Sequence, residues 1–295
     1  MTSARSFTHA LAARFAAGAA DTALLCPDGE GGAAARTYAE LDTRAGAVAA
    51  ELRRRGRAGE PVLVSMDGGP HTVAALLGCL YAGAVAVPVP PPDLSRAAAE
   101  RTAAIAAETD ATVALTESAH APELSRRLAA AGHSSVVCLA VDRLPGRGGG
   151  WQPPERSGAD TALIQYTSGT TAGPRGVLVT HTNLMATMES LRSALGTDRT
   201  SRIGGWLPLH HDLGLIGQLL HPLWLGATAV LMPQRLFSTA PLSWLREVSR
   251  HGVTVTAAPT PPTPAASPMS PPTLSRISTS ARWTSPSTPP NRCPP

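Results

Sequence analysis

The sequence contains no lysine, because all 25 of its basic residues are arginines. A mechanism that requires a lysine ammonium group is therefore excluded for these 295 residues. Cysteine is scarce as well: the chain has four, and no two of them form a Cys-x-x-Cys pair. This scattered spacing argues against a zinc site and against a disulfide framework.

Long apolar runs are also absent. No stretch of about 18 apolar residues occurs, so no membrane span is predicted. The N-terminal 15 residues lack the basic start and continuous apolar stretch of a secretory signal, and we expect cytoplasmic residence. The net charge is only +4, and the one basic run, residues 53–55, is typical of a solvated helix end. Nucleic acid is therefore not expected as a partner.

A segment rich in glycine and hydroxyl groups follows an apolar run at residues 161–165. Residues 166–177 read Tyr-Thr-Ser-Gly-Thr-Thr-Ala-Gly-Pro-Arg-Gly-Val. Glycines let the backbone turn tightly and bring N–H groups close to an anion, hydroxyls donate to phosphate oxygens, and arginine adds a permanent charge. We therefore predict that residues 167–176, called the phosphate loop below, bind phosphate groups. The predicted contacts are Thr167, Ser168, Gly169, Thr170, Thr171, Gly173, Arg175 and Gly176.

The strands predicted on either side, residues 161–165 and 177–181, make the phosphate loop a hairpin-like connection. A P-loop is excluded, because that motif needs Gly-x-x-x-x-Gly-Lys-Ser/Thr at the start of a helix. Here no lysine follows and Pro174 interrupts the segment. A flexible surface loop without a ligand is the remaining alternative.

The phosphate loop resembles the signature loop of adenylate-forming enzymes, the superfamily of acyl-CoA synthetases, peptide-synthetase adenylation domains, luciferases and fatty acyl-AMP ligases. Two positions depart from the usual pattern. Ala172 stands where the family usually has glycine, and Arg175 where it usually has lysine. The arginine keeps the positive charge, so the anion-binding character is retained.

A second polar cluster, residues 206–217, reads Trp-Leu-Pro-Leu-His-His-Asp-Leu-Gly-Leu-Ile-Gly. A metal site is disfavoured because adjacent side chains cannot easily face one ion, and a Ser–His–Asp triad because no Gly-x-Ser-x-Gly turn is present. A polar loop at the mouth of an apolar pocket fits the flanking leucines best. A His–Asp turn with a purely structural role stays open.

This cluster resembles the His-Asp-x-Gly-Leu-Ile-Gly segment of fatty acyl-AMP ligases, in which the histidine lies beside the acyl carboxylate. The resemblance implies that His211 is the catalytic residue that orients the carboxylate against the α-phosphate. Asp212, which supports the loop, and Gly214 belong to the same substrate-binding segment. His210 has no assigned role, and no metal ligand is identified.

Strand and helix patterns alternate between residues 7 and 157, which predicts an α/β fold with a parallel sheet. Segments 36–42 and 80–92 resemble N-terminal landmarks of adenylate-forming enzymes. The resemblance implies the N-terminal part of the large domain, built of layered parallel β/α subdomains. We expect residues 1–157 to form the first subdomain and residues 158–258 the start of a second, incomplete one that carries the phosphate loop.

The composition changes abruptly after residue 258. Residues 259–295 hold 12 prolines, 13 serines or threonines, and only three charged side chains. Such a segment buries too little apolar surface to offset its ordering entropy, so we expect a disordered tail. We hypothesise that it arises from a shifted reading frame and that the chain is truncated, with the resemblance covering about residues 7–258.

The resemblance implies ATP-dependent activation of a fatty or other carboxylic acid to an acyl adenylate, with Mg²⁺ as the metal cofactor. The acyl group would pass to an acyl-carrier protein or to a polyketide or peptide synthase. Two alternatives stay open. One is an inactive fragment that at most binds a nucleotide or a partner, and the other is an acyl-CoA ligase.

Overall fold

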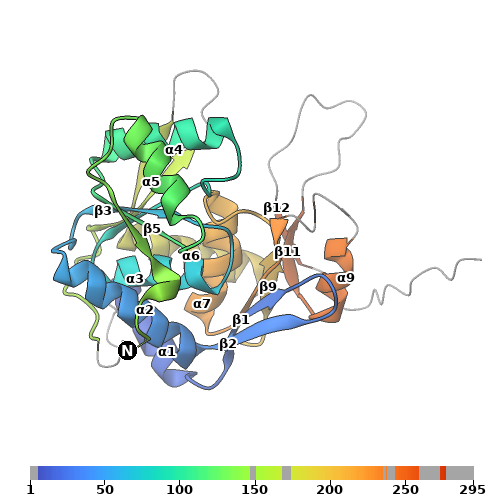
Figure 1. The fold of residues 1–295 in the computed structure, drawn as a ribbon. Helices are drawn as coiled ribbons and strands as arrows, with labels where there is room; N and C mark the ends of the chain where they lie inside the picture. Colours follow the sequence, from blue (N-terminus) through green and yellow to red (C-terminus); the bar gives the residue numbers. More distant parts are fainter. Residues whose placement is uncertain are drawn as a thin grey trace, which may run out of the picture.

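The computed structural model describes residues 6–146, 151–167, 174–234, 237, 243–258 and 273–276. Two six-stranded sheets form its framework (Figure 1). The strands of the first sheet are Pro61–Ser65 (β3), Val85–Val89 (β4), Val113–Thr116 (β5), Val137–Ala140 (β6), Thr161–Thr167 (β7) and Arg175–Thr180 (β8). Those of the second are Thr22–Pro27 (β1), Ala33–Thr37 (β2), Arg202–Gly205 (β9), Thr228–Leu231 (β10), Val255–Ala258 (β11) and Thr273–Arg276 (β12). The expected α/β architecture is confirmed.

The first sheet has the order β6-β5-β3-β4-β7-β8 and is parallel except for β8. All five residues of β4 are buried, as expected for a strand covered on both faces. Alternate residues of β3 enter different cores: Val62 and Val64 face the core that holds helices α2 (Tyr38–Arg54) and α3 (Pro70–Ala82). Leu63 faces α4 (Arg96–Thr109) and α5 (Ala121–Ala130), which lie on the opposite side (Figure 1).

The second sheet is completed by the N-terminal hairpin. Its order is β12-β11-β9-β10-β1-β2, and β1 pairs in parallel with β10, so that Leu24 lies opposite Ala229. The remaining helical segments are α1 (Phe7–Ala17), η1 (Val141–Arg143), α6 (His181–Leu195), the π-helical η2 (Leu213–Leu220), α7 (His221–Leu225) and α9 (Ser243–Arg250). One continuous core joins α1, α2, α3, η2 and α7 between the two sheets.

The division between the sheets does not coincide with the boundary expected near residue 158. Strands β7 and β8, residues 161–180, complete the first sheet, whereas β1 and β2 belong to the second. A composition change marks a linker, but it does not show which distant strand a segment pairs with. The strand pairing alone does not decide how the chain divides into subdomains. The assignment of residues 1–157 and 158–258 to two subdomains stays a prediction.

The start of α2 is fixed by a local sequence signal. Thr37 and Glu40, three residues apart, form a capping box: the Thr37 hydroxyl accepts from the Glu40 N–H at 3.2 Å, and the Glu40 carboxylate accepts from the Thr37 N–H at 2.8 Å. Along this helix, Val48 meets α3 at Gly78, where an added Cβ would lie 2.5 Å from the Val48 Cβ. Glycine is required there for the two helices to pack this closely.

The C-terminal segment contains one departure from expectation. Residues 259–295 are predicted to be disordered, but Thr273–Arg276 form β12, antiparallel to β11, with Val255 opposite Arg276. The edge of β11 offers backbone hydrogen bonds that need no apolar side chains, which explains how so polar a segment joins the sheet. The rest of 259–295 lies outside the described residues. Within the described part of the chain, every helix is too short or too polar to cross a membrane.

Strand β8 forms one edge of the first sheet. Its side chains are largely exposed, including Val177 at 48% and Leu178 at 63%. Because neighbouring residues of a strand point to opposite faces, apolar groups are presented on both faces of this edge.

We predict that Tyr38→Phe destabilises the fold by about 1 to 2 kcal/mol, because it removes the donor to a buried carbonyl. The Tyr38 hydroxyl donates to the Ala227 carbonyl at 2.6 Å and joins the start of α2 to the approach of β10. Urea unfolding measures the change. Tyr81→Phe is the matched control, because its acceptor Asp42 keeps a hydrogen bond from the Trp151 indole at 3.0 Å. An equal or larger loss in the control would contradict the prediction.

We also predict that the free energy of unfolding falls as the pH drops from about 6.5 to about 5. Burial lowers the pKa of His181 and of His221 to about 4. The unfolded chain therefore takes up protons at these imidazoles in a pH range where the folded protein does not, so acid favours unfolding. Urea titrations at several pH values measure the slope, which His221→Gln and His181→Gln should each reduce. An unchanged slope in both variants would show that other groups control it.

Candidate functional site

A pocket of about 240 Å³ lies where strands of both sheets end. The carboxyl ends of parallel strands are the usual position of ligand sites in open α/β sheets. The first sheet contributes the ends of β4 and β7, and the second contributes the loop after β9, residues 206–212. Helix α4 forms the remaining wall. The lining residues of this cavity, called the α4 pocket below, are Pro88, Pro90, Ala97, Ala98, Arg101, Ile105, Tyr166, His210 and His211.

A single side-chain hydrogen bond connects β7 to the loop after β9. Gln165 is only 6% exposed, and its Nε2 donates to the carbonyl of His210 at 2.7 Å. The bond fixes the start of the phosphate loop relative to residues 206–212, called the histidine loop below. The sequence carried a signal for it, because a glutamine interrupts an otherwise apolar strand.

The described part of the phosphate loop has the hairpin geometry expected from the sequence. Strand β7 pairs antiparallel with β8, so Thr167 lies opposite Arg175 and Tyr166 opposite Gly176. A Cβ at Gly176 would lie 3.0 Å from the Ile164 side chain and 3.1 Å from the Tyr166 ring, which leaves little room for a larger residue. The other predicted contacts, Ser168, Gly169, Thr170, Thr171 and Gly173, lie outside the described residues.

The histidine loop is held by its own backbone and by one carboxylate. The N–H of His211 donates to the Pro208 carbonyl at 3.1 Å, and the Asp212 carboxylate accepts from the N–H of Leu213 at 2.7 Å. A Cβ at Gly214 would lie 2.2 Å from the Pro208 carbonyl oxygen, so this position accepts only glycine without rearrangement. Asp212 and Gly214 thus shape the turn that places His211 at the pocket.

The surroundings of both histidines of the α4 pocket favour the neutral imidazole, because they lower the pKa of each ring. Burial lowers the pKa of His210 to about 4, with smaller contributions from His211 and Arg101. Burial also lowers the pKa of His211, and Arg101 adds to this effect while Asp212 opposes it. The positive charge of the pocket therefore comes from Arg101.

Arg101, His210 and Gln165 lie at the site although the sequence analysis assigned them no role. The Nη2 atom of Arg101 donates to the carbonyl oxygens of Thr167 at 2.6 Å and Tyr166 at 3.3 Å. No local pattern distinguishes this arginine within its alanine-rich helix. Its place at the loop results from the packing of α4 over the first sheet.

A larger cavity of about 530 Å³ adjoins the α4 pocket and shares His210 with it. Two acidic residues, Asp67 and Asp93, line it together with the apolar side chains of Met66, Leu94 and Trp206. Its charge is therefore opposite to that of the α4 pocket.

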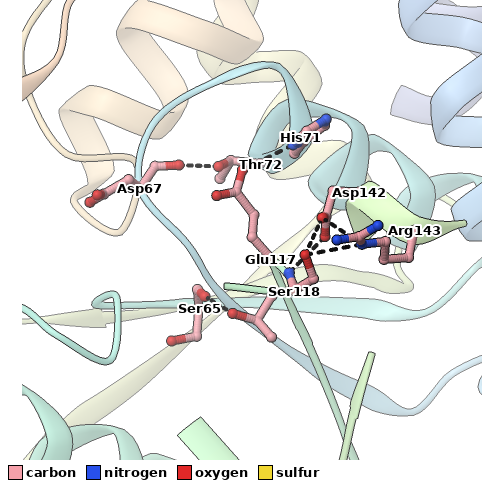
Figure 2. A network of polar contacts seen from close by, with 9 residues as sticks. Ser65, Asp67, His71, Thr72, Glu117, Ser118, Asp142 and Arg143 are labelled. Atoms are coloured by element: carbon pink, nitrogen blue, oxygen red, sulfur yellow. Dashed lines mark hydrogen bonds and ion pairs between the residues drawn. The ribbon is translucent and has the colours of Figure 1, made fainter. Parts of the chain in front are cut away.

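A polar network links the ends of β3 and β5 with the segments that follow them (Figure 2). The Ser65 hydroxyl donates to the Pro90 carbonyl at 2.8 Å, and the Thr116 hydroxyl donates to the Ser65 carbonyl at 2.9 Å. Farther along, the Ser118 N–H donates to the Asp142 carboxylate at 2.7 Å. These groups satisfy one another, so the network holds the proline segment that lines the pockets and is itself structural.

The comparison with known proteins agrees with this geometry. The family model described as "AMP-binding enzyme" matches residues 12–263. The medium-chain-fatty-acid–[acyl-carrier-protein] ligase JamA of Moorena producens is 35% identical over 223 residues, which are 74% of this chain and 38% of JamA. The long-chain-fatty-acid–AMP ligase FadD23 of Mycobacterium tuberculosis is 34% identical over 245 residues, 79% of this chain and 41% of the relative.

A solved structure shows the same fold. The fatty acyl-adenylate ligase of L. pneumophila, in complex with acyl adenylate and pyrophosphate, matches with a TM-score of 0.78 and 29% identity. The match covers 86% of this chain and 44% of the other, and the curated relatives are likewise covered to only about two fifths of their length (38% and 41%). The family match and the agreement in fold lead to one conclusion: this chain belongs to the family of AMP-binding enzymes.

Proposed function

We propose that this chain takes part in the ATP-dependent activation of a fatty acid to an acyl adenylate. The observation that carries the proposal is the hydrogen bond from Gln165 to the His210 carbonyl at 2.7 Å. It brings the hairpin of the phosphate loop and the loop of His211 to one pocket, so a bound nucleotide and a bound acid would meet there. The acyl adenylate and pyrophosphate in the solved structure of the L. pneumophila ligase support this reading.

The reaction joins a carboxylate oxygen to the α-phosphorus of ATP and breaks the bond between the α-phosphorus and the bridging oxygen, so that pyrophosphate leaves. In our proposal the glycines and hydroxyls of residues 167–176 hold the phosphates, and Arg175 offsets negative charge that develops on them. The neutral imidazole of His211 orients the carboxylate toward the α-phosphate. The protein thus acts by positioning and by electrostatic stabilisation.

Magnesium would balance phosphate charge in such a reaction. Proteins bind it through one or two carboxylates together with phosphate oxygens and water. No group of three His, Cys, Asp or Glu side chains gathers around a common point in the described part of the chain. The α4 pocket itself is lined by no carboxylate. The described residues that line the α4 pocket therefore supply no carboxylate ligand for this ion, and no step of the proposed reaction is assigned to it.

The substrate class follows from the relatives, whose names specify medium-chain and long-chain fatty acids. We propose a fatty acid as substrate and the thiol of an acyl-carrier protein, or of a polyketide or peptide synthase, as acceptor. An acyl-CoA ligase is the alternative within the family. Cytoplasmic residence, expected from the sequence, belongs to the same proposal.

A second candidate function is nucleotide binding without turnover. The observation that favours it is the complete absence of lysine from the sequence. In adenylate-forming enzymes, as the resemblance implies, a lysine of a mobile C-terminal domain assists adenylation. The 295 residues of this sequence would bind phosphates through the loop without themselves supplying that lysine.

Fatty-acid-dependent exchange of labelled pyrophosphate into ATP distinguishes the two candidates. We expect exchange above background with a medium-chain or long-chain acid, and a reduction of about 100-fold in His211→Ala, because a positioned polar contact to the reacting group is lost. His133→Ala serves as the control and should match the wild type, because His133 is half-buried in the turn before β6 and lines neither cavity. Nucleotide binding without any exchange would establish the second candidate instead.

The phosphate loop is tested by ATP binding. We predict that Gly169→Val abolishes binding measured by calorimetry, because a branched side chain would prevent close approach of the backbone to the phosphates. Gly146→Val is the matched control, since a Cβ at Gly146 meets no atom within 4 Å. Unchanged affinity in Gly169→Val, with cooperative unfolding preserved, would remove the loop from the site.

A further inference from the structure

We propose that Arg101 is the anion-binding residue of the α4 pocket, and that the same guanidinium positions the start of the phosphate loop. The inference rests in part on the proposed function, because the anion it would bind there is a phosphate of the nucleotide or the carboxylate of the acid. Arg101, which lies on helix α4, adds a second positive charge to the one supplied by Arg175.

The positioning role follows from the contacts of one nitrogen. Arg101 Nη2 donates to the carbonyl oxygens of Thr167 and Tyr166, at 2.6 and 3.3 Å, where β7 passes into the phosphate loop. Hydrogen bonds from a charged donor are stronger than those between neutral groups. Two of them at consecutive residues fix both the end of β7 and the direction in which the loop leaves the sheet.

The binding role follows from the donors that remain. A guanidinium carries five N–H groups, and both hydrogen bonds use the same nitrogen. Nε and Nη1 have no hydrogen-bond partner among the described residues, although the side chain lines the pocket. Arginine presents such donors as a planar fork that matches the two oxygens of a carboxylate or phosphate.

The surroundings of Arg101 leave its charge uncompensated. Among the described residues, the other side chains that line the pocket are apolar or neutral and none is acidic. Burial, with a smaller contribution from the carboxylate of Glu108, raises the pKa of Tyr166 to about 12. A lone cation among apolar and neutral groups attracts an anion more strongly than it would in water.

Arg101 also acts on the imidazoles beside it. Burial is the main cause of the lowered pKa of His210 and of His211; the charge of Arg101 adds to it, and Asp212 on the same loop opposes it at His211. Both effects favour neutral imidazoles, so an anion in the pocket meets one fixed cation. The charge of Arg101 therefore produces an effect on His211 that a purely structural hydrogen bond would not produce.

The test compares Arg101→Gln, Arg101→Lys and Arg96→Gln in the full chain. Arg96 is the matched control, because it lies on the same helix, is 93% exposed at its side chain and pairs only with the exposed Glu100. Calorimetry gives the affinity for three probes: inorganic pyrophosphate, ATP and decanoate. NMR titration gives the pKa of His211, and thermal unfolding confirms that each variant is folded.

We expect Arg101→Gln to weaken binding of at least one probe about 10- to 100-fold and to raise the pKa of His211, with Arg96→Gln unchanged in both. Arg101→Lys should keep the low pKa of His211, since it keeps the charge, while losing part of the affinity because it lacks the planar fork. Loss confined to pyrophosphate and ATP would identify a phosphate as the anion, and loss confined to decanoate a carboxylate.

The inference and the proposed function fail in different ways. Binding of pyrophosphate that depends on Arg101 in a chain without exchange activity would uphold the anion site and reject turnover. Unchanged affinity for all three probes together with an unchanged pKa of His211 in a folded Arg101→Gln variant would overturn the inference, even if exchange activity were found.

Discussion

The parallel pairing of β1 with β10 is the constraint on which the rest of the structure depends. It joins residue 24 to residue 229 and makes the N-terminal hairpin of β1 and β2 part of a sheet whose other four strands come from residues 202–276. Helices α1 and α2, which flank this hairpin in sequence, are thereby held between the two sheets, where they share one core with α3, η2 and α7. Residues of α1 and α2 pack in the core that lies between the two sheets. The relative position of the sheets, and with it the shape of the α4 pocket, depends on this packing.

The candidate site combines rigid supports with few charges. The Pro90 segment, Gly214 and Gln165 are each fixed by close contacts or backbone hydrogen bonds, so the groups that face the pocket need little further ordering when a ligand binds. The half-buried imidazole of His210, the exposed imidazole of His211 and the guanidinium of Arg101 then define its electrostatics. This arrangement suits a reaction in which positioning contributes more than acid–base chemistry.

Most of the local structure could be predicted from the sequence, and most of the assembly could not. The capping box at Thr37, the apolar strand β4 and the hairpin at the phosphate loop follow from residues within a few positions of one another. The partner of β1 and the neighbours of Arg101 depend on contacts across more than 60 residues, for which a single sequence carries no pattern. The β-strand at residues 273–276 was missed for another reason: its pairing with residues 255–258 uses backbone hydrogen bonds and leaves no apolar pattern in the sequence.

The edge strand β8 bears on how the protein behaves at high concentration. An unpaired edge is a template for another extended segment, and proteins often protect such edges with lysine. This chain has no lysine, and Arg175 is the one charged residue in β8, whereas Val177 and Leu178 are exposed on its two faces. Among the described residues no strand pairs with the outer edge of β8, so this edge is the place where an extended segment of another molecule can add to the first sheet.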